Sequence, residues 1–170
     1  MSEAIPPTVP TINVVECWIF RITAADRLEV LLMRRSAGRI FAGLWQPVTG
    51  RPEEGELAPV AALREVEEET GLGRSAIEAF YTLDQVVQLY AAARNGISHL
   101  VVFAARVRPD AQIRISHEHD DLRWVGPGEA VNLAIWPAYR ESLARIERIA
   151  ADTGYAYWFE LDEAGRRKAG

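Results

Sequence analysis

The chain has 170 residues, of which 49% are hydrophobic and 25% charged, which fits one domain with a buried core. A composition so close to the globular average argues against long disorder, collagen-like repeats and a coiled coil. The formal net charge of -5 does not complement a phosphate backbone, so we expect no nucleic-acid duplex as a partner.

The first part of the chain predicts a flexible lead-in followed by two paired strands. Residues 1–11 contain three prolines and few apolar anchors. Residues 12–22 are rich in β-branched and aromatic side chains. A polar turn follows, and residues 28–35 are the expected hairpin partner of the first strand. The only cysteine, Cys17, lies in the first strand, which excludes an internal disulfide and favours a reducing, cytoplasmic location.

Short elements lead from this hairpin into the best helix prediction of the chain. Residues 36–43 predict a loop, residues 44–50 an extended segment and residues 51–57 an acidic loop. Residues 58–70 predict a helix, with a proline in its first turn and a glycine just past its end. Apolar side chains expected to face the core recur three and four positions apart at Val60, Leu63, Val66 and Thr70.

The second half of the chain predicts further strands and a second helix. Residues 80–90 and 99–107 predict two strands, with residues 91–96 as their turn. Residues 122–125 predict a short strand. Pro137 begins an amphipathic helix whose inner face is formed by Tyr139, Leu143, Ile146 and Ile149.

These elements predict an α+β fold with a mixed sheet, because strands in antiparallel-looking pairs surround two helices. We assign residues 12–153 to one domain, preceded by the flexible segment 1–11. Residues 154–170 are expected to form a C-terminal tail or a further strand of the same domain. The longest uninterrupted apolar run, residues 100–105, is far shorter than a membrane span, so no membrane is expected as a partner.

Glutamates crowd one turn of the predicted helix. Glu65, Glu68 and Glu69 stand at positions i, i+3 and i+4, which would put their carboxylates on one face opposite the apolar stripe. At an effective dielectric constant of ~20 and a separation of ~6 Å, each carboxylate pair costs about 3 kcal/mol before screening. A solvated acidic face is one explanation. The other is a divalent cation, since hard carboxylate oxygens suit Mg²⁺ or Mn²⁺.

The segment around this turn carries a longer pattern. From Gly50 to Leu72 the chain resembles the Nudix box, G-x5-E-x7-R-E-U-x-E-E-x-G-U with U aliphatic. The matching positions are Gly50, Glu56, Arg64, Glu65, Val66, Glu68, Glu69, Gly71 and Leu72. The resemblance implies an α/β/α sandwich in which the box forms a loop–helix–loop. It also implies metal-dependent hydrolysis of a phosphoanhydride in a compound where a group X is linked to a diphosphate.

The resemblance further implies a role for each box residue. Its metal ligands would be Glu65, Glu68 and Glu69, with the carbonyl oxygen of Gly50 as an additional ligand. The catalytic set would comprise Glu65 as the first choice for general base, with Arg64 and Glu56 as the pair that orients the helix from behind. In this family the base sometimes comes from a loop instead. Mg²⁺ is the expected cofactor, with Mn²⁺ as an alternative.

A further ligand is expected after the box. Many family members carry an extra acidic ligand there, and Glu118 is the candidate in this chain. Solvated acids in a turn are the competing explanation. His117 and His119 flank Glu118, but we favour packing or solvent roles for both because the site is already rich in oxygen ligands.

The substrate class stays open between related phosphoanhydrides. The chain is similar to bacterial dihydroneopterin triphosphate pyrophosphatases at Trp45, Gln46, Val48, Thr49, Gly50, Glu118, His119, Trp124 and Trp136. This similarity implies that a dihydroneopterin or nucleoside triphosphate is split into a monophosphate and pyrophosphate. Diadenosine polyphosphate hydrolases of this family carry a tyrosine after the box, and Tyr90 keeps that class as an alternative. ADP-ribose hydrolases usually carry a proline there, and the lack of proline between Gly73 and Arg108 counts against that class.

The candidate substrate contacts are side chains that could hold phosphates or a flat heterocycle. They are Arg34, Arg35, Trp45, Gln46, Arg51 and Tyr90, although charged strand ends are often solvated and aromatic rings often belong to the core. The expected partner is a small-molecule phosphoanhydride, and a homodimer remains an alternative to a monomer. A Nudix domain that senses a nucleotide without turnover is the competing class, and the intact box argues against it.

Overall fold

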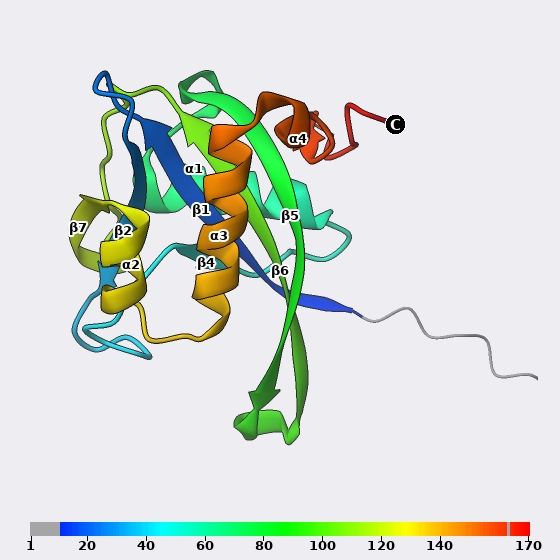
Figure 1. The fold of residues 1–170 in the computed structure, drawn as a ribbon. Coiled ribbons are helices and arrows are strands. Elements are labelled where there is room, and N and C mark those ends of the chain that lie inside the picture. The colour runs from blue at the N-terminus through cyan, green and yellow to red at the C-terminus, as the bar shows by residue number, and fades with distance from the viewer. Residues whose placement is uncertain (1–10, 163) are drawn as a thin grey trace, which may run out of the picture.

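The computed structural model describes residues 11–162 and 164–170. Within these residues the strands form one sheet in the order β3-β2-β1-β6-β5-β8, with β4 also paired to β1 and β7 to β2. β1 and β6 run parallel, and the other pairs in this part of the chain are antiparallel. The predicted α+β fold with a mixed sheet is therefore confirmed (Figure 1).

The strand bounds follow most of the predicted segments. The strands are β1 (Ile12–Ile22), β2 (Leu28–Arg35), β3 (Trp45–Gln46), β4 (Val48–Gly50), β5 (Ile77–Ala91), β6 (Gly96–Val107), β7 (His119–Val125) and β8 (Glu160–Leu161). β5, β6 and β7 each begin three residues before the predicted start. β8 falls in the predicted tail and pairs with β5.

Helices cover both faces of the sheet, as the sandwich prediction requires. α1 (Ala58–Thr70) packs on one face, and α2 (Pro127–Leu133), α3 (Ala138–Ala151) and α4 (Thr153–Tyr157) lie on the other (Figure 1). β1 runs between these layers, and its side chains alternate between them. Cys17 joins the core on the α1 side, whereas Trp18 joins the core on the α3 side.

The helix of the box has the predicted bounds but a different buried stripe. α1 ends where Gly71 adopts φ 71°, a left-handed conformation that glycine takes without strain. Val66 and Thr70 are buried as predicted. Val60 is 39% exposed, so its assignment to the core was wrong; Ala61 and Ala62 are buried there instead. Small side chains on this stripe let the helix axis approach the sheet closely.

The second predicted helix is confirmed, and two further helices were missed. α3 buries Tyr139, Leu143, Ile146 and Ile149 as expected. α2 has only seven residues, and Pro127 at its first turn is a start signal that its glycine-containing sequence obscures. α4 is shorter still and is capped by Asp152, whose carboxylate accepts the backbone N–H of Tyr155.

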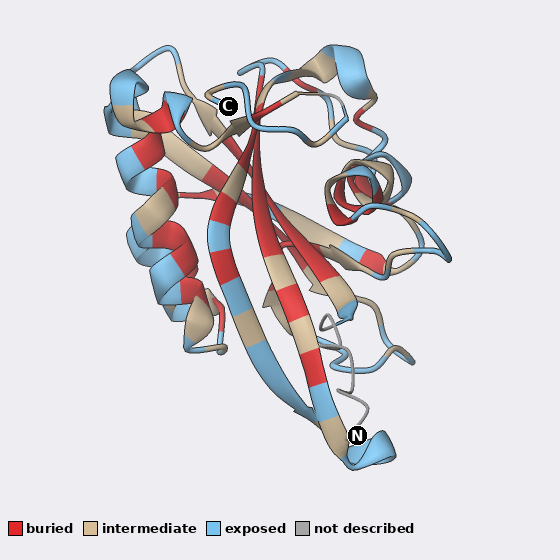
Figure 2. Cartoon of the chain, turned by 90° about the vertical axis from the view of Figure 1, so that its right-hand side faces the viewer, coloured by how far each residue is buried: buried red, intermediate tan, exposed pale blue. Residues whose placement is uncertain are grey.

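The β5–β6 hairpin reaches beyond the body of the molecule. Its inner half packs under α3, whereas its outer half is largely exposed (Figures 1 and 2). A short 3₁₀ turn, Ala92–Arg94, connects the strands at the predicted place. Within the described residues no helix is long and apolar enough to span a membrane. The flexible lead-in predicted for residues 1–11 lies, apart from Thr11, outside the described residues.

Candidate active site

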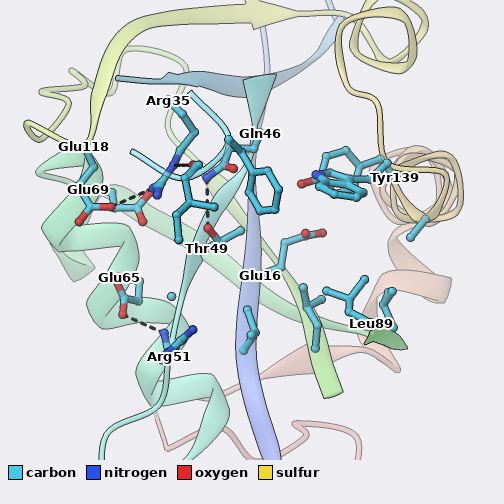
Figure 3. A pocket seen from close by; sticks show the side chains of 18 of the residues that line it. Glu16, Arg35, Gln46, Thr49, Arg51, Glu65, Glu69, Leu89, Glu118 and Tyr139 are labelled. Carbon is cyan, nitrogen blue, oxygen red and sulfur yellow. Dashed lines mark hydrogen bonds and ion pairs between the residues drawn. The ribbon is translucent and has the colours of Figure 1, made fainter. Parts of the chain in front are cut away.

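A cavity opens where the sheet divides. The C-terminal half of β1 pairs with β2 from Phe20 onward, whereas its N-terminal half pairs with β4 at Val15–Cys17. β2 pairs on its other side with β7. The cavity between these arms has a volume of about 1110 Å³. Glu65, Glu69 and Glu118 lie at one end of the cavity, which is acidic, and Leu89 and Tyr139 lie at the other, which is largely apolar (Figure 3). The lining also includes Glu68 and the apolar or aromatic side chains of Val14, Val87, Leu100 and Trp136.

Arg64 holds the acidic end together from behind. Its Nε and Nη2 atoms donate to the two oxygens of Glu56, each at 3.0 Å, and Nη2 also donates to the backbone carbonyl of Arg51 at 3.0 Å. The hydrogen bonds from Arg64 hold the pKa of Glu56 below its ordinary value. Neither side chain lines the cavity, so the geometry is that of a support for the helix and loop.

Glu65 occupies a narrow position between this support and the cavity. Its Oε1 accepts hydrogen bonds from Arg64 Nη1 at 3.0 Å and from the backbone N–H of Arg51 at 3.3 Å. Burial raises its pKa, against the effect of Arg64. A Cβ atom at Gly50 would lie 2.0 Å from Glu65 Cδ, so a side chain at Gly50 would displace the carboxylate. The glycine that begins the box therefore leaves the space that the Glu65 carboxylate occupies.

Glu68 is the most exposed carboxylate of the group. Its side chain is 58% exposed, and Oε2 lies 3.2 Å from Arg64 Nη1 in an i,i+4 pair. This cation relieves part of the repulsion in the acidic turn, a contribution that the sequence interpretation did not take into account.

Glu69 differs most from expectation. It does not face away from the core, because its residue is only 4% exposed. Burial and the neighbouring charges of Glu65 and Glu118 raise its pKa to about 8, although the backbone N–H of Thr49 donates to it. Its Oε2 has no hydrogen-bond partner within residues 11–162 and 164–170, and it lies 3.8 Å from His119 Nε2.

His119 is neutral at physiological pH. Burial, followed by the charge of Arg35, lowers its pKa to about 4. Both ring nitrogens are buried without a hydrogen-bond partner among the described residues. His119 is thus a packed neighbour of Glu69, whereas His117 lies at the cavity wall.

The acidic end has the donor chemistry of a divalent-metal site. Among the described residues no three acidic, histidine or cysteine side chains stand close enough to form a preassembled metal cluster. Several of the carboxylate oxygens form ion pairs with arginines instead. Arg64 contacts Glu65 and Glu68, and Arg35 Nη1 lies 2.9 Å from Glu118 Oε2. The unpartnered buried oxygen of Glu69 and the hard oxygen set nevertheless fit a divalent cation.

Four of the six predicted substrate contacts line the cavity. They are Arg35, Gln46, Arg51 and Tyr90. Arg34 and Trp45 do not line it, because each lies next to a cavity residue on a strand and so points to the opposite face. Arg34 Nε instead donates to Asp120 Oδ1 at 2.7 Å, and its guanidinium carbon lies 5.8 Å from the Trp45 ring centroid.

Sequence reasoning missed the residues at the other end of the cavity. Glu16 on β1 is 3% exposed and accepts a hydrogen bond from Trp18 Nε1 at 2.8 Å. A second hydrogen bond joins it to the Tyr139 side chain, and burial raises the pKa of Glu16 to about 7. The sequence signal was an acidic residue inside the strand segment INVVECWIFRI, between the apolar Val15 and Cys17.

The comparison with known families decides the assignment. The model of the NUDIX domain family matches residues 14–146. The chain belongs to the Nudix hydrolase family. The resemblance of the box is thereby confirmed, and Nudix hydrolases generally use divalent metal ions.

Solved Nudix structures share the fold. An Ap4A hydrolase from C. elegans in a binary complex superposes with a TM-score of 0.69 at 22% identity, covering 83% of this chain and 98% of that one. A Listeria monocytogenes protein described as a NUDIX hydrolase superposes with a TM-score of 0.71 at 24% identity, covering 83% and 96%. Both identities are low, so these likenesses concern the fold.

Curated relatives carry different names. A Bis(5'-nucleosyl)-tetraphosphatase [asymmetrical] of Rattus norvegicus is 32% identical over 127 residues, covering 74% of this chain and 83% of the relative. A dihydroneopterin triphosphate diphosphatase of Escherichia coli is 52% identical over only 48 residues, 28% of this chain and 30% of the relative. A Myxococcus xanthus protein named octanoyltransferase is 38% identical over 121 residues, 69% of this chain, but the match spans only 32% of that protein's length.

Proposed function

We propose that the protein hydrolyses a phosphoanhydride bond in a nucleotide-like compound, with Mg²⁺ as cofactor and Mn²⁺ as an alternative. The preferred substrates are a nucleoside triphosphate or dihydroneopterin triphosphate, which would give a monophosphate and pyrophosphate. One observation carries the proposal: a single cavity joins the carboxylates of the box to an apolar, aromatic end. Its volume of about 1110 Å³ is enough for a heterocycle with its phosphates.

The residues of the acidic end have two tasks in this proposal, to hold the metal ion and to accept a proton. Glu65, Glu68, Glu69 and Glu118, with the carbonyl of Gly50, would hold the divalent ion. When bound, the ion supplies neutralisation of phosphate charge and makes a water more acidic. Glu65 lines the cavity and is held by the support formed by Arg64 and Glu56, so it would take the proton from the attacking water. Glu118 is the alternative base on a loop.

The arginines of the cavity would position the phosphates. Arg35 and Arg51 line the wall beside the carboxylates. The Arg35 guanidinium already pairs with Glu118, so a phosphate that enters there meets a cation whose orientation is fixed. Positioning and charge complementarity supply most of the rate enhancement in phosphoryl transfer, and these side chains provide both.

A dinucleoside polyphosphate is the second candidate substrate. The rat relative is named a tetraphosphatase of bis(5'-nucleosyl) compounds and is covered over 83% of its length. Tyr90 lines the cavity on the exposed part of the β5–β6 hairpin, where the residue is 67% exposed. An exposed ring in that position could stack on a second nucleoside, and such a substrate would give unequal products, ATP and AMP from the adenosine compound.

A substrate panel tests both candidates. Purified protein with Mg²⁺ is incubated with dihydroneopterin triphosphate, the nucleoside triphosphates, diadenosine tetraphosphate and ADP-ribose, and products are identified by mass. Pyrophosphate with a monophosphate supports the first candidate, and ATP with AMP supports the second. Binding without turnover of any compound in the panel would refute hydrolysis and favour a nucleotide sensor.

A matched pair of variants tests the role of the box. Glu68→Gln removes one proposed ligand charge from the cavity and should lower kcat by about 10² or more without loss of fold. Glu67→Gln makes the same change one residue earlier, at an exposed side chain that does not line the cavity, and should leave kcat unchanged. A fully active Glu68→Gln protein would refute its role as a ligand.

A further inference from the structure

Glu16 is a buried acid that the proposed hydrolysis does not use. It lies on the central strand β1, where its backbone registers with Thr49 of β4 and Val102 of β6. Its carboxyl group lines the cavity between Thr49 and Tyr139, on the side of the cavity away from Glu65 (Figure 3). In the part of the chain that the structure describes, it has no basic ion-pair partner.

The contacts of Glu16 orient its carboxyl group without using its full capacity. Trp18 Nε1 donates to Oε1 at 2.8 Å, and the Tyr139 side chain forms a second hydrogen bond. A carboxylate offers about four acceptor positions on its two oxygens. Two contacts therefore leave acceptor capacity for a molecule in the cavity, and they keep the group from rotating away from it.

The surroundings of Glu16 suit the faces of a flat ring. Apolar side chains of Val14 and Leu100 lie at the same end of the cavity, together with the Tyr139 ring. Phe41 and Trp136 form another wall and pack edge to face with ring centroids 5.5 Å apart. A heterocycle placed there would direct its phosphates towards the acidic end.

We propose that Glu16 recognises the heterocycle of the substrate by accepting two adjacent N–H groups, the pattern of a 2-amino-4-oxo ring edge as in guanine and reduced pterins. The inference rests on the proposed function and adds the substrate class to it. A carboxylate accepts two parallel N–H donors and donates none. Adenine and cytosine place an unprotonated ring nitrogen beside the amino group, so one Glu16 oxygen would face a second acceptor.

The substitution Glu16→Gln tests this assignment. Glutamine keeps the shape but replaces one acceptor by an NH₂ donor, which mismatches the guanine edge and matches the adenine edge. The measurement is kcat/KM for GTP and ATP with Mg²⁺ at about pH 8, where Glu16 is ionised. We expect the GTP-to-ATP ratio to fall about 10- to 100-fold, and dihydroneopterin triphosphate to follow GTP. Glu78→Gln on β5, outside the cavity, is the control and should leave the ratio unchanged.

The outcomes separate this inference from the proposed function. If the wild type hydrolyses these substrates but the ratio stays within about twofold in a folded Glu16→Gln protein, Glu16 does not recognise the ring. A wild-type preference for ATP refutes the proposal in the same way. If no substrate is hydrolysed, the proposed function fails, and equilibrium binding of GTP and ATP to the same proteins still tests Glu16. Should Glu16→Gln not fold, Tyr139→Phe removes the orienting hydroxyl and should lower the ratio; an unchanged ratio counts against the proposal.

Discussion

Replacing Glu16 by glutamine should stabilise the protein at alkaline pH. Burial raises the pKa of Glu16 from 4.5 to about 7, so the folded chain retains a proton that the unfolded chain releases between these values. Stability therefore falls as pH rises through this window, because the unfolded state binds fewer protons. At about 1.4 kcal/mol per pH unit, the free energy of unfolding of the wild type falls by about 3 kcal/mol. The whole decrease is present above pH ~7, and there is none below pH ~4.5.

Glutamine carries no charge, so the stability of the variant does not fall with pH for this reason. We expect Glu16→Gln to have a free energy of unfolding about 3 kcal/mol above that of the wild type at pH ~8, and nearly equal to it at pH ~4.5. Both proteins are unfolded with urea across this range, and the difference between them is plotted against pH, since the other titrating groups then largely cancel. Glu78→Gln, which removes a half-exposed glutamate paired with Arg106, is the matched control for the loss of a carboxylate outside the cavity.

A difference that does not change with pH would refute the reasoning. It would mean that Glu16 titrates alike in the folded and unfolded chains, and that water reaches its carboxyl group despite the 3% exposure. A variant that becomes less stable as pH rises would contradict the sign of the argument.

Three further substitutions test the support of the site and the core. Gly50→Ala should displace the Glu65 carboxylate and remove most activity, whereas Gly128→Ala, whose added methyl meets nothing within 4 Å, should leave kcat unchanged. Arg64→Lys loses the bidentate contact with its glutamate partner and should lower kcat about 10- to 100-fold with a small change in Tm, measured by steady-state kinetics and thermal unfolding. Leu143→Ala truncates a side chain that is 1% exposed and should cost about 2–5 kcal/mol in urea unfolding.

Local patterns predicted those elements whose own sequence carries a strong signal. The helix Ala58–Thr70 was predicted at both ends, because a proline stands in its first turn and a glycine follows its last residue. β1 was predicted in full from its β-branched and aromatic content, and β2 was predicted in full as the segment that follows a polar turn. α2 and α4 were missed because helices of seven and five residues have too few turns to establish a period and depend on packing.

The two ends of the cavity differed in how well they could be predicted. The box places its residues within one loop and one helix, so spacing alone indicates which carboxylates come together. The opposite end combines Glu16, Phe41, Trp136 and Tyr139 from separate elements, and only the path of the sheet brings them together. The burial of Glu69 was also hidden, because Thr49 of β4 and His119 of β7, both distant in the sequence, lie against its carboxylate.

The acids with raised pKa values share one location, and this links stability to ligand binding. Glu16, Glu65 and Glu69 all line the same cavity, and burial is the first cause of the shift in each. Each therefore lowers the stability of the folded chain as it ionises. Glu65 and Glu69 share the acidic end, where a divalent cation would offset their repulsion. Glu16 lies apart from that end, and N–H donors of a bound ring would offset the loss of stability that its ionisation causes. A cation and a 2-amino-4-oxo nucleotide should therefore stabilise the fold separately, each by binding its own end of the cavity.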